Sequence, residues 1–354
     1  MMKKTLSVLT LALVSSHSYA IVNGTPVDWK KNDNIVRLDS KSLDRQGQCT
    51  GTLIAGKYVL TAAHCLGTKG IVDSLTTQAN ETFPTDYSAY QQHPDYVQDS
   101  LDMIRDVGII PLAQPIDYHS IQFIANPSTH TFTKGEAIYV TGFGGTYRTE
   151  QPLNRADFTF SHPQWSDAAY IYVNQTNQSH TTGGDSGSAW TDDQGDIVAI
   201  HKGSYLVFAG ENIPEHRETY GTDIAYAKDF ILETVDGWHY PTQASASNKT
   251  TLTIQSLHIN NIDDNGFHTD GDVSLLSNTC SNVNPYEKCT LTVESQGGQG
   301  KIVLSDDEVI QINKPQPKAS SSAKESDGGS GGSMNLWGLA LLAAFGAYRK
   351  KRLQ

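Results

Sequence analysis

The segment TLIAGKYVLTAAHC (residues 52–65) decides the class of fold. It is rich in β-branched, aliphatic and aromatic side chains and is interrupted by a glycine, which is typical of short β-strands joined by turns. EAIYVTGFGG (136–145) and DIVAIHKGSYLVF (196–208) have the same character. Long helical periodicity is rare between residues 21 and 238, so we predict an all-β domain over this range.

A single helix is expected at the end of this domain. AYAKDFILETV (225–235) places Tyr226, Phe230 and Ile231 on one face at helical spacing. The predicted all-β domain therefore closes with a C-terminal helix.

The whole chain is long and acidic. Its 354 residues exceed the size of one ordinary domain, so we expect two. The formal net charge of −12 argues against a nucleic-acid partner, because such proteins usually carry a basic stripe. The sequence has no Cys-x-x-Cys pair, His/Cys cluster or phosphate-binding glycine loop, so we predict neither a metal nor another cofactor.

Residues after 238 indicate a second, smaller domain. PTQASASNKT has the composition of a linker, which we place at 239–250. Short β-rich runs follow between 251 and 314, so we predict a small β-sandwich there, with an immunoglobulin-like topology as one option. A spacer role and a binding role are both open for this domain.

The N-terminus has the features of a secretion signal. Two lysines precede an apolar run over 6–14, and Ser18 and Ala20 are the small residues that signal peptidase requires. We predict a signal peptide over 1–20, an exported protein, and signal peptidase as a processing partner. An uncleaved membrane anchor is the alternative.

Export permits disulfides, and the cysteines suggest two local pairs. By spacing, these are Cys49 with Cys65 and Cys280 with Cys289. Four cysteines allow three connectivities, so the spacing expresses a preference only.

The C-terminus has two parts. Residues 315–333 are rich in Pro, Ser, Lys and Gly, and we predict that they are disordered. Residues 334–354 form an apolar run that ends in the basic cluster RKKR. As a helix the apolar run would reach about 22 Å, short of a hydrocarbon core of about 30 Å. A helix that spans a thinned bilayer and a helix packed on the protein are both open.

Three segments carry the residues of a nucleophilic site. TAAHC contains His64, RDVGIIPL contains Asp106 and TTGGDSGSAW contains Ser186. Asp99 and Asp102 lie near Asp106, but only Asp106 begins an apolar strand pattern. A serine hydroxyl needs a base to remove its proton, and histidine can act first as that base and then as the acid.

These segments together resemble the chymotrypsin/trypsin family of serine proteases. The likeness covers residues 21–238 and rests on motifs in family order, namely IVNG, CTGTLIAGKYVLTAAHC, HPDY, RDVGII, VTGFGG and GDSG. It implies two packed six-stranded β-barrels with the site in the cleft between them. It also implies that the Cys49–Cys65 disulfide lies next to the catalytic histidine.

The resemblance assigns a role to each site residue. Ser186 would be the nucleophile, His64 the base, and Asp106 the group that orients the imidazole and stabilises its charged form. The backbone N–H groups of Gly184 and Ser186 would bind the oxyanion of the tetrahedral intermediate. The substrates would be proteins or peptides.

The predicted signal peptide ends directly before IVNG. In the family, a freed Ile or Val amine pairs with the Asp that precedes the catalytic serine, which here implies Ile21 and Asp185. If signal peptidase cuts after Ala20, export itself would release this amine, and no separate zymogen would exist. A cut elsewhere, which would leave a short pro-segment, is the alternative.

The residue on the N-terminal side of the cleaved bond, P1, is open. Trypsin-like members carry an Asp six residues before the nucleophile, where this chain has His180, and they keep a cysteine in this loop that is missing here. TTGGDSGSAW followed by IVAIHKG resembles instead the bacterial glutamyl endopeptidases. The likeness implies that Thr181 and His201 bind an acidic P1 side chain, and that a protonated His201 would bind it more strongly.

Two features depart from the glutamyl enzymes. That group typically has Asn at the position of Asp185, and Lys202 is unusual after His201. Lys202 would either add positive charge near the pocket or face solvent. Acidic, basic and other P1 preferences therefore stay open, and the acidic preference is favoured.

The last segment, GGSGGSMNLWGLALLAAFGAYRKKR, resembles the GlyGly-CTERM sorting tail of Gram-negative bacteria. The resemblance implies removal of the tail by a rhomboid-type protease, and then surface display or release, often by type II secretion. A permanent C-terminal anchor is the alternative.

We therefore predict a secreted or surface-displayed serine endopeptidase. The competing hypothesis is a protease fold kept as a binding or adhesion scaffold. The complete set of His64, Asp106 and Ser186 disfavours it, because a scaffold needs none of the three.

Overall fold

The protein is represented by a computed structural model that describes residues 21–97, 105–145, 148–164, 169–210, 213–263 and 266–315. The predicted signal peptide, Asp99, Asp102 and the chain beyond residue 315, with its predicted disordered linker and apolar tail, lie outside these residues. Among the described residues, no helix is both long enough and apolar enough to cross a membrane.

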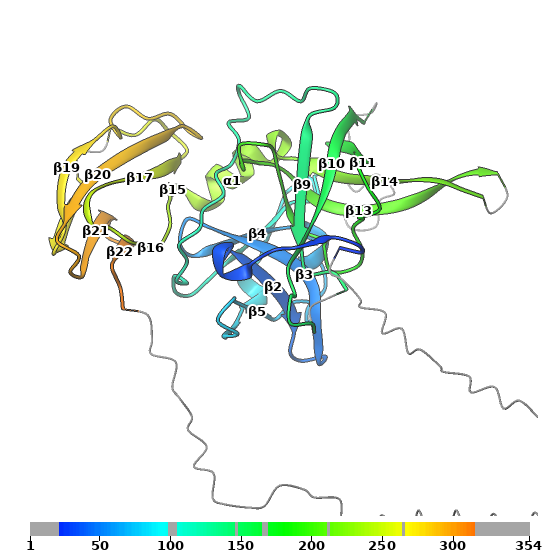
Figure 1. Cartoon of the computed structure of the whole chain (residues 1–354), viewed down its shortest axis with the longest axis horizontal. Coiled ribbons are helices and arrows are strands. Elements are labelled where there is room, and N and C mark those ends of the chain that lie inside the picture. The colour runs from blue at the N-terminus through cyan, green and yellow to red at the C-terminus, as the bar shows by residue number, and fades with distance from the viewer. Residues whose placement is uncertain are drawn as a thin grey trace, which may run out of the picture. The chain divides into compact units, whose positions relative to one another are not determined.

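One group of six strands forms a closed antiparallel β-barrel (Figure 1). The ring closes because β9 pairs with both β10 and β12. In ring order the strands are β9 (Ala137–Gly142), β10 (Asn154–Pro163), β11 (Tyr170–Gln175), β14 (Ile213–Asp223), β13 (Ile197–Gly210) and β12 (Ala189–Thr191). The short strand β1 (Thr25–Pro26) adds to the edge of β10. In Figure 1, β13 and β14 extend beyond the barrel as a two-stranded arm.

A second group of seven strands forms an open sheet, a half-barrel on the N-terminal side of the chain. Its order is β6 (Thr82–Pro84), β5 (Ser74–Thr76), β2 (Ile35–Ser40), β3 (Arg45–Ile54), β4 (Tyr58–Thr61), β8 (Gly108–Pro111) and β7 (Gln91–Gln92). The expected all-β class is therefore confirmed, and one of the two expected six-stranded barrels is present as a closed barrel. The expectation of a second six-stranded barrel was wrong, because the described strands of the other unit form an open sheet of seven.

The segment 52–65 runs from the end of β3 through β4 into the 3-10 helix η2 (Ala63–Leu66). Gly56 makes the turn between the two strands with a positive φ of 75°. A Cβ atom at this position would lie 2.6 Å from the hydroxyl of Tyr240, so only glycine fits the turn as it is packed.

The predicted C-terminal helix is confirmed, with one difference at its start. The helix α1 spans Lys228–Val235 and buries Phe230 and Ile231. The residues before it form a 3-10 turn, η4 (Ile224–Ala227), in which Tyr226 is exposed. The prediction that Tyr226 shares the buried face was wrong, because the tighter turn rotates it away from that face.

Residues 237–312 contribute two four-stranded sheets. One has the order β15 (Gly237–His239), β17 (Asn248–Leu257), β20 (Lys288–Ser295) and β19 (Ser274–Asn278). The other has the order β16 (Gln243–Ala244), β22 (Glu308–Ile312), β21 (Gly300–Ser305) and β18 (His268–Gly271). The predicted β-sandwich thus has strands on both sides of a shared apolar core.

The structure corrects the prediction that residues 239–250 form a linker. β15 pairs with β17, and β16 runs parallel to β22, so this stretch belongs to both sheets of the sandwich. Tyr240 is buried in the sandwich core. The linker-like composition misled the prediction because pairing with strands far along the chain covers these residues.

The sandwich and the rest of the unit share buried contacts. Leu257 and Tyr286 belong to the apolar cluster of the N-terminal half-barrel. The side chain of Gln255 accepts a hydrogen bond from the Ile124 N–H at 3.0 Å and donates to the Ile124 carbonyl at 2.6 Å. The described residues up to Lys314 therefore belong to one compact unit.

Both predicted disulfides are confirmed. Cys49 is bonded to Cys65, which ties β3 to η2, and Cys280 is bonded to Cys289 in the sandwich. The first bridge closes a loop with a sequence separation of 16 residues. Closing a loop of that size limits the unfolded chain and stabilises the fold by about 3 kcal/mol.

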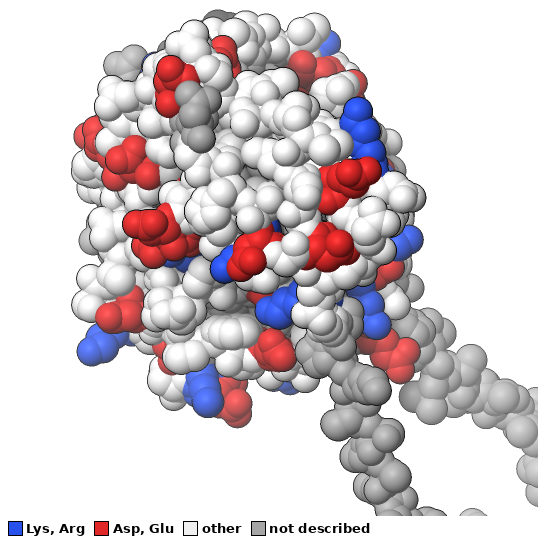
Figure 2. Space-filling view, turned by 90° about the vertical axis from the view of Figure 1, so that its left-hand side faces the viewer, with Lys and Arg blue, Asp and Glu red and all other residues white. Residues whose placement is uncertain are grey.

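Charged side chains are spread over the face drawn in Figure 2. Acidic and basic groups alternate there with uncharged surface, and the basic groups do not gather into a stripe on this face.

Candidate active site

His64 and Asp106 form a tight pair. His64 lies on η2, and Asp106 lies just before β8, the strand that pairs with β4. Nδ1 of His64 is 2.6 Å from Oδ2 of Asp106, and the backbone N–H of His64 donates to Oδ1 at 2.8 Å. Because a carboxylate accepts and does not donate, the proton on the imidazole sits on Nδ1, and Nε2 is left as a base.

The exposure of the two groups differs in a useful way. The Asp106 side chain is fully buried, whereas the His64 side chain is 29% exposed. The carboxylate is therefore held away from water, while the imidazole edge remains accessible to a reactant.

Ser186 lies on the turn between residue 181 and β12. Its carbonyl accepts a hydrogen bond from the Thr50 N–H at 2.8 Å and lies 3.9 Å from Sγ of Cys65. The next residue, Gly187, has a φ of 85°, and a Cβ atom there would lie 2.0 Å from Oγ1 of Thr61. These contacts hold the serine beside the element that carries His64.

Gly184 has a constrained position on the same turn. Its φ is 102°, and a Cβ atom there would lie 2.6 Å from the Gly47 carbonyl. Its own carbonyl accepts a hydrogen bond from Oγ1 of Thr50 at 2.9 Å. Within the described part of the chain, the N–H groups of Gly184 and Ser186 have no hydrogen-bond acceptor. Both donors are therefore available to a ligand.

Asp185 is a buried carboxylate between these two residues. It accepts hydrogen bonds from the N–H groups of Gly144 and Thr182, both at 2.8 Å. Burial raises its pKa to about 7, and the two backbone hydrogen bonds oppose that rise. Among the described side chains, no cation pairs with it. A cationic group placed here would be strongly stabilised.

Ile21 is docked next to the same loop. Its side chain is fully buried in a cluster that includes Val140 and Trp190. The following residue, Val22, accepts a hydrogen bond from the His180 N–H at 3.0 Å. The segment that begins at Ile21 therefore runs along the loop that leads to Asp185.

All three residues predicted to bind the P1 side chain line one cavity with Ser186. The cavity has a volume of about 310 Å³. Its walls are His180, Thr181, Thr182, Gly183, Ser186, His201, Gly203, Ser204 and Arg217. Sequence reasoning missed Ser204 and Arg217. No motif marks either residue, and they reach the cavity only through the pairing of β13 with β14.

His201 is held as a neutral ring. It is buried, and its Nδ1 accepts a hydrogen bond from the indole N–H of Trp190 at 3.3 Å. Burial lowers the pKa of His201 to about 3, and the nearby His64 adds to the effect. The single ring proton is then on Nε2. The stronger binding expected of a protonated His201 is therefore disfavoured, because desolvation opposes the charged ring.

The other two predicted P1 residues differ in character. Thr181 is buried, and within the described residues its hydroxyl has no hydrogen-bond partner. His180 is half-buried, and burial lowers the pKa of its ring. The cavity thus offers one unpaired hydroxyl and neutral imidazoles.

Lys202 takes neither of the two expected positions. Its ammonium lies 4.6 Å from the ring centroid of Tyr170 and contacts the Tyr170 hydroxyl. Lys202 is the extra residue of a bulge between His201 and Gly203 of β13, and it does not line the cavity that His201 lines. Burial lowers the pKa of Lys202 to about 8.

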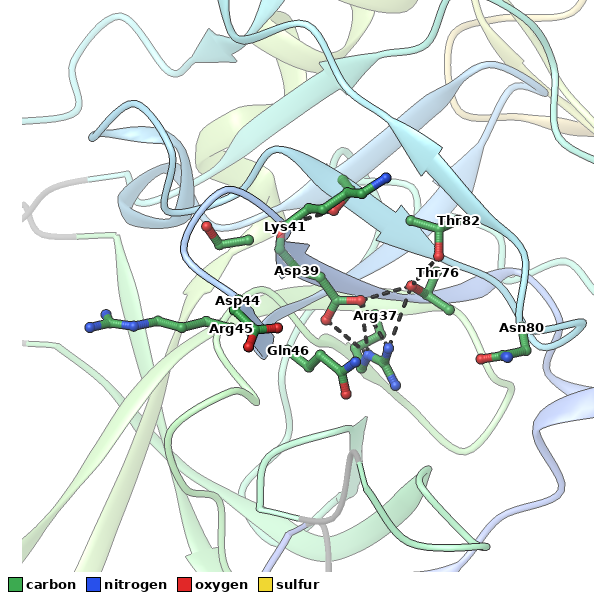
Figure 3. A pocket seen from close by; sticks show the side chains of 11 residues that line it. Arg37, Asp39, Lys41, Asp44, Arg45, Gln46, Thr76, Asn80 and Thr82 are labelled. Atoms are coloured by element: carbon green, nitrogen blue, oxygen red, sulfur yellow. Dashed lines mark hydrogen bonds and ion pairs between the residues drawn. The ribbon is translucent and has the colours of Figure 1, made fainter.

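A second cavity lies in the N-terminal half-barrel (Figure 3). Two aspartates line it, and one of them, Asp39, accepts hydrogen bonds from Nε of Arg37 at 2.9 Å and from Oγ1 of Thr76 at 2.7 Å. Asp39 also accepts from the Gly47 N–H at 2.6 Å. Because the Gly47 carbonyl packs against Gly184, this ion pair supports the turn beside Ser186.

Among the described residues, one group has the arrangement of metal ligands, namely Cys49, His64 and Cys65. Both sulfur atoms are joined in a disulfide and cannot bind an ion as thiolates.

A closed β-barrel and a half-barrel with a His–Asp pair beside a serine-bearing turn define a chymotrypsin-like protein. The family model described as "Trypsin" matches residues 21–231. The chain therefore belongs to the trypsin family.

Individual relatives are distant. Phenoloxidase-activating factor 3 of Holotrichia diomphalia is 31% identical over 120 residues, which is 28% of this chain and 34% of that protein. The chain thus spans about a third of the length of the first curated relatives it matches.

Two solved structures are also similar to this chain. The VesB protease of Vibrio cholerae is 19% identical with a TM-score of 0.47, covering 83% of this chain and all of that one. Mouse neuropsin, a serine protease expressed in the limbic system, is 20% identical with a TM-score of 0.49, covering 60% of this chain and 99% of that one.

Proposed function

We propose that the protein is a serine endopeptidase that cleaves peptide bonds through a covalent acyl-enzyme. The observation that carries the proposal is the buried Asp106 bonded to Nδ1 of His64, next to a turn that holds Ser186 at the mouth of a cavity. A buried carboxylate that fixes one tautomer of a partly exposed histidine is the arrangement that activates a serine nucleophile.

Each step uses a group of this chain. Oγ of Ser186 attacks the substrate carbonyl, and Nε2 of His64 accepts the serine proton while Asp106 stabilises the imidazolium. The N–H groups of Gly184 and Ser186 donate to the oxyanion. The imidazolium then protonates the leaving amine. Water, deprotonated by the same histidine, hydrolyses the acyl group and restores the serine.

Maturation would complete the site. In the proposed mature protein, signal peptidase cuts after Ala20 and leaves the amine of Ile21 free. That amine would supply the cation that the buried carboxylate of Asp185 lacks, since the segment from Ile21 already lies along the loop before Asp185. The ion pair would hold the turn of Gly184 and Ser186 in the reactive form.

The cavity favours an acidic P1 residue. Thr181 offers an unpaired hydroxyl, and His201 carries its ring proton on Nε2, so both can donate to a carboxylate. None of the residues that line the cavity is an Asp or Glu, which disfavours a lysine or arginine at P1.

The proposed location is the cell surface or the exterior of a Gram-negative bacterium. The signal peptide, a GlyGly-CTERM-like tail, a rhomboid-type processing protease and type II secretion are all part of this proposal. They rest on segments of the sequence outside the described residues, and a mass measurement of the mature protein tests them.

Labelling with a fluorophosphonate tests the enzymatic proposal. The secreted protein should bind about one equivalent at Ser186, and it should cleave a peptide library that the Ser186→Ala variant leaves intact. Ser128→Ala is a matched control, because Ser128 is an exposed serine that does not line the cavity. A folded protein that is neither labelled nor active would instead favour a binding scaffold.

A further inference from the structure

A carboxylate that enters the cavity needs positive charge. Burying an anion against neutral donors alone leaves most of its desolvation cost uncompensated. His201 cannot provide charge, because its ring is buried and receives the Trp190 N–H at Nδ1. Lys202 points to Tyr170 instead. The cation must come from another wall of the cavity.

Arg217 is the permanent cation among the residues that line the cavity. It lies on β14, opposite Leu206 of β13, close to where this hairpin leaves the barrel. Its Nη1 donates to Oγ of Ser204 at 3.2 Å, and Oγ of Ser204 donates to the Thr181 carbonyl at 3.3 Å. These two hydrogen bonds tie the guanidinium to the residue whose hydroxyl is unpaired.

The positive charge of Arg217 is not neutralised by an ion pair with a neighbouring acidic side chain of the described residues. The adjacent Glu218 faces the other side of the strand, where it contacts the Tyr205 hydroxyl and lies 3.7 Å from Nε2 of His216. A guanidinium has five N–H donors, so most of them remain for a ligand.

We infer that Arg217 is the specificity-determining cation of this pocket, and that its guanidinium binds the side-chain carboxylate of a P1 glutamate or aspartate. Thr181 and His201 add neutral hydrogen bonds that orient the carboxylate. This inference rests on the proposed endopeptidase function. In this inference the cation that binds the carboxylate is Arg217 and not His201, and an arginine stays charged at every physiological pH.

The test compares paired substrates that differ only in Glu or Gln at P1. The two side chains have nearly the same shape, so the ratio of their kcat/KM values reports the contribution of charge. In the Arg217→Gln variant, kcat/KM for the Glu substrate should fall by about 10- to 100-fold, the range for a hydrogen bond to a charged group. The value for the Gln substrate should change by less than about threefold.

Two further variants keep the test sharp. Arg217→Lys retains the charge without the planar fork and should keep an intermediate Glu/Gln ratio. Arg155→Gln is the matched control, because Arg155 is a partly exposed arginine that pairs with Asp157 on β10 and does not line the cavity. It should leave the ratio unchanged.

The outcomes separate this inference from the proposed function. If the protein is labelled at Ser186 but Arg217→Gln keeps the original Glu/Gln ratio, or lowers both values equally, Arg217 does not recognise the carboxylate. The same holds if the unmodified enzyme shows no preference for Glu over Gln. If the unmodified protein is neither labelled nor active, the endopeptidase proposal fails, and the inference fails with it.

Discussion

At the scale of single residues, burial decides the chemistry of the site. The same imidazole group is an accessible base at His64, where the side chain is 29% exposed and a carboxylate holds Nδ1. At His201 it is a neutral donor, because the ring is enclosed and bonded to Trp190. Residue type alone could not predict this difference, because it depends on how far the surrounding strands enclose each ring.

Asp185 provides the first prediction. Its carboxylate is buried and awaits a cation, which we propose is the Ile21 amine. In the mature protein, Asp185→Asn should slow labelling of Ser186 by about 10- to 100-fold, because the charge-assisted hydrogen bond that orders the turn is lost. The rate of fluorophosphonate labelling measures this effect directly.

The control for this experiment is Asp192→Asn, a carboxylate in the turn after β12 that lies outside the cavity. Labelling of Asp185→Asn at the unmodified rate, with the N-terminus verified as Ile21, would remove the ion pair from the proposal.

At the scale of the elements, the turn from residue 181 to β12 is fitted against the N-terminal half-barrel. Glycines and the Asp185–Ser186 pair mark this segment in the sequence. These motifs could not predict the close approach of the turn to Thr61 and Gly47, which belong to strands far away in the chain. The β13–β14 pairing is similar, since its register alone brings Arg217 to the cavity.

Gly187→Ala tests this fit. A Cβ atom there would lie 2.0 Å from Oγ1 of Thr61 and 2.4 Å from the Thr50 carbonyl, at a φ of 85°. We expect the free energy of unfolding to fall by about 2 to 4 kcal/mol, because both overlap and backbone strain must be relieved. Urea denaturation in a Ser186→Ala background, which prevents self-cleavage, measures the change.

Gly183→Ala is the matched control, because a Cβ atom at Gly183 meets nothing within 4 Å. The two variants should differ by at least about 2 kcal/mol. Equal stabilities would show that the turn relaxes without cost.

At the scale of the whole molecule, the sandwich belongs to the same compact unit as the two barrel units and is not an independent domain. Gln255 of β17 is fully buried, and its amide also donates to the Tyr286 carbonyl at 3.0 Å. His239 of β15 accepts a hydrogen bond from the Ala55 N–H at 3.0 Å, in the turn between β3 and β4. The sandwich therefore contacts the segment that leads to His64.

Gln255→Ala should weaken this junction. The substitution leaves the N–H and the carbonyl of Ile124 without their hydrogen-bond partners. Each buried polar group that lacks a partner lowers the free energy of unfolding by about 1 to 3 kcal/mol. We expect the thermal midpoint to fall while calorimetry still shows one transition. Gln91→Ala, at an exposed glutamine, should leave the midpoint unchanged. Separate transitions for the two parts in the unmodified protein would contradict a shared core.

The junction should also make stability depend on pH. Burial lowers the pKa of His239 to about 4, whereas an unfolded histidine has a pKa of about 6.5. Between about pH 6.5 and pH 4, His239 is protonated in the unfolded chain but stays unprotonated in the folded protein. The free energy of unfolding should then decline, as pH falls, by up to about 1.4 kcal/mol per pH unit.

Urea denaturation of the Ser186→Ala protein at several pH values measures this slope. Replacing the histidine in His239→Gln should make the slope shallower, whatever its effect on stability at neutral pH. Identical slopes would assign the acid sensitivity to other groups.

The sequence by itself determined the all-β class, the closing helix and the ordered set of His64, Asp106 and Ser186, and it favoured the two disulfides that the structure contains. These features depend on local composition or on short motifs, and both can be read directly from a single sequence. The tertiary structure alone decided that residues 237–250 belong to the sandwich, that His201 is buried against Trp190, and that Arg217 lines the pocket. Each of these depends on which distant strands pair and on how much water they exclude, and no local pattern encodes either.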